Sequence, residues 1–115
     1  MQPIERQEKL VQWFAKASLA HAQAIEEMAE FEAAAQVTDL NRYFAALKKE
    51  GGIDRLLALL DHPDPAVSGM VAVYCMRLEP KRCSAQLKKL STLPGMIGFR
   101  AEAALKRWEA GEWSL

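Results

Sequence analysis

The feature that most constrains the fold is the distribution of glycine and proline along the chain. No residue between Ile4 and Glu50 is glycine or proline, whereas all six glycines and four of the five prolines lie beyond this span. Because these two residues are the strongest helix breakers, the first span permits long helices and the rest must be divided into short elements. No alternating strand pattern remains, so we predict an all-α chain.

Apolar residues in the first half recur every three or four positions, which is typical of a helix with one face toward a core. The pattern predicts a helix from about Ile4 to Ala35, either straight or bent midway. Its inward-facing residues are expected to be Val11, Phe14, Ser18, Ala22, Ile25 and Ala29, with Leu19 and Met28 widening the stripe. The Thr38 side chain is expected to cap a second helix, which ends at the Gly51-Gly52 pair.

The prolines predict the helix boundaries of the second half. A short apolar helix from Ile53 to Leu60 must stop at the turn Asp61–Pro65, which contains two prolines. Asp64 is expected to cap the next helix, and Pro65 suits the first helical position because no N–H is needed there. Further helices are predicted from Pro65 to Leu78, from Pro80 to Leu90 and from about Met96 to Ala110.

The composition of these later helices predicts which face each one buries. Residues 65–78 are apolar almost all round, so this helix is expected at the centre of the core. In the following helix, Cys83, Leu87 and Leu90 share the inward face. The residues expected to face inward from the last helix are Met96, Phe99, Ala103 and Trp108.

Six helices joined by short loops in 115 residues fit a single domain over residues 1–115. A leucine-rich helix, an Asp-x-Pro-Asp-Pro turn and a second helix starting with alanine and valine are typical of a HEAT-type unit. The sequence therefore predicts antiparallel helix pairs in a HEAT-like α-α superhelix or compact right-handed solenoid.

Several segments together resemble a known family. These are LVQWFAKASLAHAQAI near the start, Asn41-Arg42, the turn LLDHPDPAV and the terminal ALKRWEAGEW. They look like the bacterial domain-of-unknown-function family 2019, a HEAT-like helical group, over most of the chain. The resemblance implies a helical fold and no established enzymatic activity or cofactor. It also suggests a setting among bacterial toxin and antitoxin genes.

The inventory of catalytic motifs is thin. The chain has no GxSxG, HExxH, Walker loop or dinucleotide fingerprint. Cys75 with His62 is the one nucleophile and base pair to consider, but a cysteine inside an apolar helix is usually a small hydrophobic residue. The two cysteines and two histidines show no zinc spacing. We therefore predict a protein that is not an enzyme, with no metal and no cofactor.

The apolar segments are too short to cross a bilayer, which takes roughly twenty apolar residues. The N-terminal residues mix charges among the apolar positions and lack the apolar core of a secretory signal. A cytoplasmic, membrane-free location is expected. Of the three tryptophans, Trp13 and Trp108 are expected to finish the ends of the core, and Trp113 to be partly exposed.

Charge is strongly segregated along a chain whose formal net charge is zero. Between Ala17 and Asn41 there are five acidic residues and no lysine or arginine. Between Arg77 and Arg107 there are eight basic and two acidic residues. Either these segments form opposite charged faces that attract partners, or they pair with each other or are merely solvated.

Two functions are predicted from this segregation. The leading one is a protein-binding module, most specifically an immunity protein that neutralises a cognate basic toxin through an acidic helix surface made of Glu26, Glu27, Glu30 and Asp39. The alternative is nucleic-acid binding by a basic surface made of Arg77, Lys81, Arg82, Lys88 and Lys89. Self-association through the apolar surface around the helix 65–78 is a third reading, and the oligomeric state stays open.

Overall fold

A computed structural model describes residues 2–115, and within this range it contains helices and turns but no strands. The helices fall into two compact units, one ending at Ala58 and the other spanning Leu59–Leu115. The all-α class is therefore confirmed. The HEAT-like superhelix and the single domain stay predictions. None of the helices described is long and apolar enough to span a membrane.

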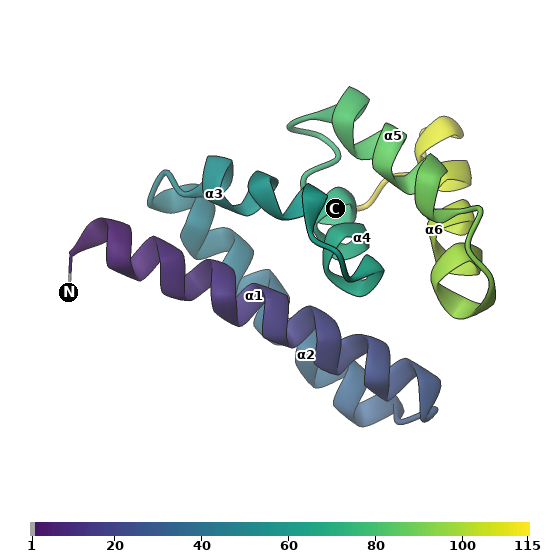
Figure 1. Cartoon of the computed structure of the whole chain (residues 1–115), viewed down its shortest axis with the longest axis horizontal. Helices are drawn as coiled ribbons and strands as arrows, with labels where there is room; N and C mark the ends of the chain where they lie inside the picture. Colours follow the sequence, from purple (N-terminus) through teal and green to yellow (C-terminus); the bar gives the residue numbers. More distant parts are fainter. Residues whose placement is uncertain (1) are drawn as a thin grey trace. The chain divides into compact units, whose positions relative to one another are not determined.

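The first unit is a long antiparallel hairpin of α1 (Pro3–Glu26) and α2 (Glu30–Lys49), with the short α3 (Ile53–Leu57) at its open end (Figure 1). Phe14 is fully buried and anchors the α1 face. The buried apolar residues of this unit are Leu10, Phe14, Ala17, Ala24, Ala33, Leu40, Leu47, Leu56 and Leu57. Of the residues expected to widen the α1 stripe, Leu19 and Met28 are instead exposed.

The single helix expected from Ile4 to Ala35 is wrong, because the chain reverses at Glu27–Ala29. The Ala29 N–H donates to the Ala24 carbonyl at 2.8 Å and the Met28 N–H to the Ile25 carbonyl at 3.1 Å. This pair of bonds is a Schellman motif, which ends a helix with one residue in the left-handed conformation. That residue is Met28, with φ 56°, where glycine is the usual occupant.

The predicted cap at Thr38 is also wrong. Its hydroxyl lies in the middle of α2 and donates back to the Ala34 carbonyl at 3.2 Å. Threonine hydroxyls in a helix interior often bond the carbonyl four residues earlier. The residue that precedes α2 is Ala29, which has no side-chain cap.

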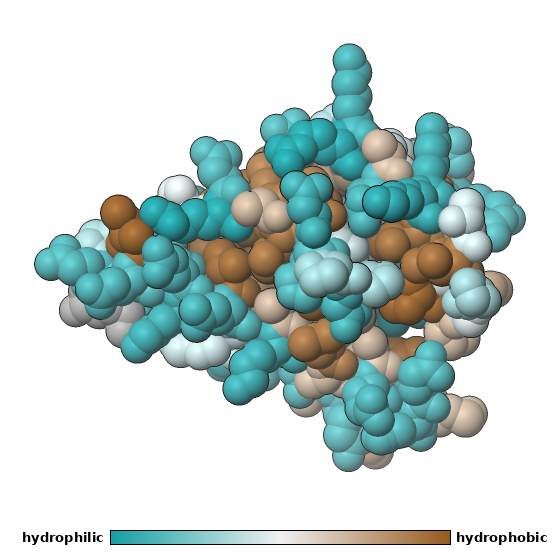
Figure 2. Space-filling model, in the orientation of Figure 1, coloured by the Kyte–Doolittle hydropathy of each residue, from teal (hydrophilic) through white to brown (hydrophobic). Residues whose placement is uncertain are grey.

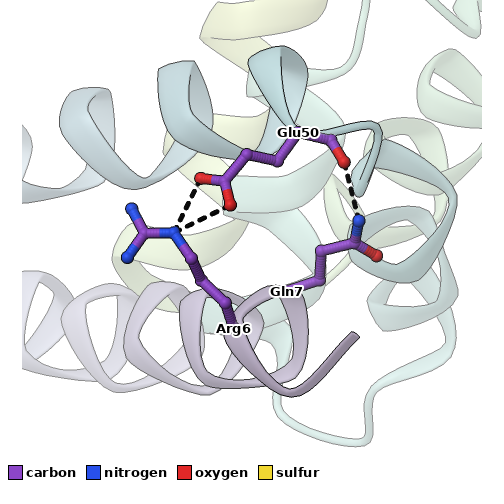
Figure 3. A network of polar contacts seen from close by, with 3 residues as sticks. All are labelled: Arg6, Gln7 and Glu50. Atoms are coloured by element: carbon purple, nitrogen blue, oxygen red, sulfur yellow. Dashed lines mark hydrogen bonds and ion pairs between the residues drawn. The ribbon is translucent and has the colours of Figure 1, made fainter. Parts of the chain in front are cut away.

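Polar contacts fix the open end of the hairpin (Figure 3). The Arg6 Nε donates to both carboxylate oxygens of Glu50, at 2.7 and 2.9 Å, and Gln7 Nε2 donates to the Glu50 carbonyl at 2.6 Å. Arg55 on α3 donates to the Gln7 side chain at 3.1 Å. These contacts tie the start of α1 to the end of α2 and to α3. The turn at Met28 lies at the other end of α1, about 30 Å away at 1.5 Å per residue.

The helices of the second unit begin where the sequence signals predict, to within one residue. Its helices are α4 (Pro65–Tyr74), α5 (Pro80–Leu90) and α6 (Gly95–Glu109). Asp64 caps α4 as predicted, since its carboxylate accepts the Ala66 N–H at 2.9 Å. Two predicted helices end early: α4 stops at Tyr74 rather than Leu78, and the 3-10 helix Ala58–Asp61 replaces the end of the helix expected to reach Leu60.

Helix α4 buries more residues than either α5 or α6, in keeping with the central place predicted for it, and α5 buries Cys83, Leu87 and Leu90. The prediction of which α6 residues face inward is wrong. Met96 and Phe99 are exposed, and the buried residues are instead Gly98, Ala101 and Leu105. A Cβ on Gly98 would overlap the carbonyl oxygen of Leu93. The lack of a side chain at Gly98 therefore lets the backbone of the turn before α6 lie directly against this helix, on the face opposite to its exposed larger side chains.

The tryptophans depart in part from their expected places. Trp13 is exposed, and its ring packs against that of Tyr43 with 5.9 Å between the ring centroids. It therefore does not lie at the end of the buried core, where it was expected. Trp108 and Trp113 are both half-buried and form an edge-to-face pair at 5.8 Å. Trp113 is thus partly exposed, as predicted, and the Arg77 guanidinium donates to its carbonyl at 2.6 Å.

Candidate functional site

The turn between α1 and α2 concentrates acidic and apolar side chains at one end of the hairpin. We call it the acidic tip and define it by Glu26, Glu27, Met28, Glu30, Phe31 and Glu32. Within residues 2–115 the four carboxylates form no ion pair, and Glu27 accepts one hydrogen bond, from Gln23 Nε2 at 3.2 Å. In the view of Figure 2 this end of the hairpin is covered mainly by hydrophilic atoms.

Two large apolar side chains project into solvent at the acidic tip. Met28 is 86% exposed and Phe31 is 90% exposed. Single exposed apolar residues are common, but here two strongly exposed ones lie three positions apart, Met28 in the turn and Phe31 in the first turn of α2. Aromatic residues that become buried on binding are frequent anchors of protein interfaces. The tip thus offers an apolar anchor framed by negative charge.

The charges at the tip do not all serve helix stability. Glu30 and Glu32 lie in the first turn of α2, where carboxylates interact favourably with the helix dipole. Glu26 and Glu27 lie at the C-terminal end of α1, where the dipole disfavours negative charge and no basic residue compensates. Two of the four carboxylates therefore act against the fold locally, which favours a role in binding for them.

The backbone at Met28 is strained. A left-handed conformation costs a residue with a Cβ roughly 1–2 kcal/mol, and two other turns of this chain that end a helix the same way use Gly51 and Gly111. Strain of this kind is often found at functional sites. The strained residue here is also the exposed methionine of the tip.

Replacing Met28 by glycine is expected to raise the free energy of unfolding by about 0.5–1 kcal/mol, because glycine adopts φ 56° without a steric penalty. Gly51→Ala is the matched control. A Cβ on Gly51 meets nothing within 4 Å, so the substitution tests its φ of 75° alone and should destabilise by about 1 kcal/mol. Urea unfolding measures both. A Met28→Gly variant less stable than the parent chain would show that the methionine side chain supports the turn.

The structure brings together three of the four predicted partner-binding residues. Glu26, Glu27 and Glu30 share the tip and are exposed. Asp39 lies nine residues beyond Glu30 in α2, which places it about 14 Å along the helix and on the opposite side. Its carboxylate also pairs with Arg42 at 3.3 Å. Asp39 therefore lies outside the acidic tip. The tip includes three residues that were not predicted as partner-binding, and they are identified by their exposure: Met28, Phe31 and Glu32.

The five residues of the predicted nucleic-acid surface are all exposed in the second unit. Two of them are engaged locally: Arg77 bonds the Trp113 carbonyl, and Arg82 lies 4.0 Å from Glu79. The lysines are Lys81, Lys88 and Lys89 on α5, and within the part of the chain that the structure describes they form no ion pair. The positive charge of this segment is therefore largely available to a partner.

A second apolar spot lies where α5 turns into α6. We call it the basic turn and define it by Lys88, Lys89, Leu93, Met96, Phe99 and Arg100. Phe99 is 69% exposed and Met96 40% exposed, three positions apart on α6. Burial lowers the pKa of the Arg100 guanidinium, with a further lowering from nearby Arg107. The basic turn thus joins an exposed aromatic ring to positive charge, with no acidic residue between Lys88 and Arg100.

The thiols and the imidazole that could serve in catalysis are either buried or hydrogen-bonded to nearby backbone. Burial raises the pKa of the Cys75 thiol to about 12 and that of Cys83 to about 11, so both thiols stay protonated at neutral pH. Neither is in a disulfide. The Nδ1 atom of His62 accepts the Asp64 N–H at 3.0 Å, a local loop contact. Residues 2–115 contain no group of three or more histidine, cysteine or acidic side chains placed to hold a metal.

No family model matches this chain, and neither the curated proteins nor the solved structures include a significant match to it. The resemblance to a HEAT-like family therefore rests on the quoted segments alone.

Proposed function

We propose that this protein is a non-catalytic binding module whose acidic tip engages a basic surface of a partner protein. The observation that carries the proposal is the exposure of Met28 and Phe31, at 86% and 90%, among four carboxylates without ion pairs in the described chain. The presence of methionine at a left-handed position and the unfavourable placement of Glu26 and Glu27 support it, because the turn itself would be more stable with a glycine at position 28 and without these two charges.

In this proposal the apolar and charged residues of the tip have different roles. Phe31 enters a pocket on the partner and loses its water, which supplies most of the binding free energy. The carboxylates speed the encounter and select a basic surface, through a field that salt screens over about 8 Å at physiological ionic strength. Raising the salt concentration should therefore slow association more than it speeds dissociation.

The most specific form of the proposal is a cytoplasmic bacterial immunity protein that neutralises a cognate toxin by covering its basic active site. A binding surface at the end of a helical hairpin suits this role, because the narrow tip can enter a concave site. We also propose, as part of this function, that the helices pack in a HEAT-like arrangement and that the chain is related to the HEAT-like family it resembles. No cofactor or metal is required for it.

Nucleic-acid binding by α5 is the second candidate, and it is supported by the exposure of its basic residues. Phosphate contacts by Lys81, Lys88 and Lys89 would make the affinity fall steeply with salt. The zero formal net charge and the lack of a base-reading motif weigh against this candidate. Failure to bind mixed-sequence DNA and RNA at low salt would exclude it.

Affinity capture with three matched chains tests the leading proposal. The parent chain, Phe31→Ala and Phe99→Ala are used as bait at low salt in the native bacterial extract. Loss of a hot-spot anchor costs at least about 2 kcal/mol, so Phe31→Ala is expected to weaken binding of the captured protein about 30-fold or more. Phe99→Ala removes an equally aromatic, exposed ring outside the tip and should bind that protein as the parent does.

Two further results decide the outcome. A partner retained equally by all three chains would contradict a binding role for the acidic tip. The immunity function is tested by expressing the captured protein in cells with and without this chain. Growth arrest that the parent relieves and Phe31→Ala does not is the expected result, and a captured protein that is harmless alone would reject the immunity form while leaving the binding module.

A further inference from the structure

The acidic tip and the basic turn carry the same apolar pair. Met28 and Phe31 are three residues apart where α2 begins, and Met96 and Phe99 are three residues apart where α6 begins. All four side chains are exposed, and in each pair the phenylalanine is the more exposed of the two. Each pair also follows or includes a residue with positive φ, Met28 in one case and Gly95 in the other. The chain therefore presents two similar apolar spots, one in each unit.

The charges around the two spots are opposite. Residues 26–32 contain four glutamates and no basic residue, whereas residues 88–100 contain two lysines, one arginine and no acidic residue. Contact between two acidic tips would bring like charges together, which opposes pairing of a spot with its own kind. Contact between an acidic tip and a basic turn would bring four negative charges next to three positive ones and bury both aromatic rings.

We propose that the acidic tip of one copy of this chain docks on the basic turn of a second copy, so that the protein associates head to tail. Phe31 and Met28 pack against Phe99 and Met96, a combination of aromatic and thioether contacts that is favourable beyond the area buried. The glutamates face Lys88, Lys89 and Arg100, which sets the orientation and the speed of encounter. The zero net charge of the whole chain adds no long-range repulsion.

This association differs from a symmetric dimer. Because the two surfaces are different, each added copy leaves one acidic tip and one basic turn unoccupied, and growth continues unless the copies close into a ring. The contact needs only this chain and does not rest on the proposed partner. It also covers the acidic tip, so a basic partner would compete with self-association for the same residues.

Sedimentation of the purified chain at low salt, over micromolar to millimolar concentration, tests the proposal with two single variants and their mixture. The parent is expected to show an average mass that rises with concentration beyond that of a dimer and falls when salt is added. The acidic tip of Phe31→Ala and the basic turn of Phe99→Ala can no longer dock, because each has lost its aromatic ring. Each variant alone should therefore remain a monomer. An equimolar mixture should form a one-to-one dimer that does not grow, since only one intact pair of surfaces remains.

Circular dichroism confirms that the two variants stay helical, as expected for side chains that are exposed. A charge exchange gives a second route to the same answer. Glu27→Lys with Glu30→Lys should abolish association, and Lys88→Glu with Lys89→Glu in the other copy should restore it in a mixture. A parent chain that stays monomeric up to millimolar concentration would overturn the proposal.

Two other outcomes would also overturn it. One is growth that persists in Phe31→Ala, which would place the contact elsewhere. The other is a monomeric parent that binds a single-stranded oligonucleotide and loses this binding in Phe99→Ala, which would assign the basic turn to nucleic acid. Since Phe99→Ala keeps its acidic tip, capture of a basic partner by this variant separates a failure of self-association from a failure of the binding module.

Discussion

Phe14→Ala is expected to lower the free energy of unfolding by about 3–5 kcal/mol, because the substitution leaves a cavity where a fully buried ring lies in the first unit. Phe31→Ala is the matched control within the same unit. The same atoms are removed there from a ring that is 90% exposed, so the change should stay within about 0.5 kcal/mol. Urea unfolding followed by circular dichroism measures both.

The contrast between the two phenylalanines tests the orientation of both hairpin helices at once. Equal losses in the two variants would mean that Phe31 is packed in solution, and the account of the acidic tip would then be wrong. If Phe14→Ala lowers the free energy of unfolding strongly and Phe31→Ala leaves it unchanged, Phe31 contributes nothing to stability. This is the result expected for a residue whose role is binding.

Gly98→Ala is expected to destabilise the chain by about 1–3 kcal/mol, which is the usual range for overpacking a tight contact. The added methyl group would overlap the Leu93 carbonyl, so the backbone of the turn before α6 must move. Gly69→Ala is the control on α4. Its Cβ would meet only a flexible methyl group, Leu90 Cδ1, at 3.1 Å, and alanine favours the helix by about 1 kcal/mol.

Thermal unfolding of these two variants separates the close approach from a general effect of glycine. A melting temperature lowered in Gly98→Ala but unchanged or raised in Gly69→Ala is expected. If both variants were as stable as the parent, the turn would not press against Gly98, and the outward direction of Met96 and Phe99 would lose its explanation.

Local signals in the sequence predicted the second unit well. Pro65, Pro80 and Asp64 act on their own neighbours, through a preset backbone angle or a bond to the next turn, and they do not depend on the rest of the fold. The start of each of these helices was therefore predictable. Their ends were less so, because α4 stops at Tyr74 without a glycine or proline.

The break between α1 and α2 escaped prediction because no glycine marks it. Met28 occupies the left-handed position, and the apolar period continues through the turn, so the pattern resembled one long helix. Tertiary contacts of the hairpin determine this reversal. A strained methionine within an apolar pattern leaves no distinct signal in a single sequence.

The candidate site was predictable in its charge but not in its apolar part. Five acidic residues without a basic one are visible in the sequence. Met28 was expected in the core stripe and Phe99 on the inward face of α6, because large apolar residues are usually buried. Their exposure depends on the turn at Met28 and on the close approach at Gly98, and neither is apparent before the fold is known.

We expect the acidic tip to be a protein-binding surface. A photoreactive phenylalanine analogue placed at position 31, with the same analogue at exposed position 12 of α1 as control, tests it most directly in living cells. Irradiation is expected to link position 31, and not position 12, to a specific protein, whose mass and peptides identify it as a basic partner or a second copy of this chain. If position 31 formed no adduct, or both positions formed the same ones, no specific protein would contact the acidic tip, and its role as a binding surface would be contradicted.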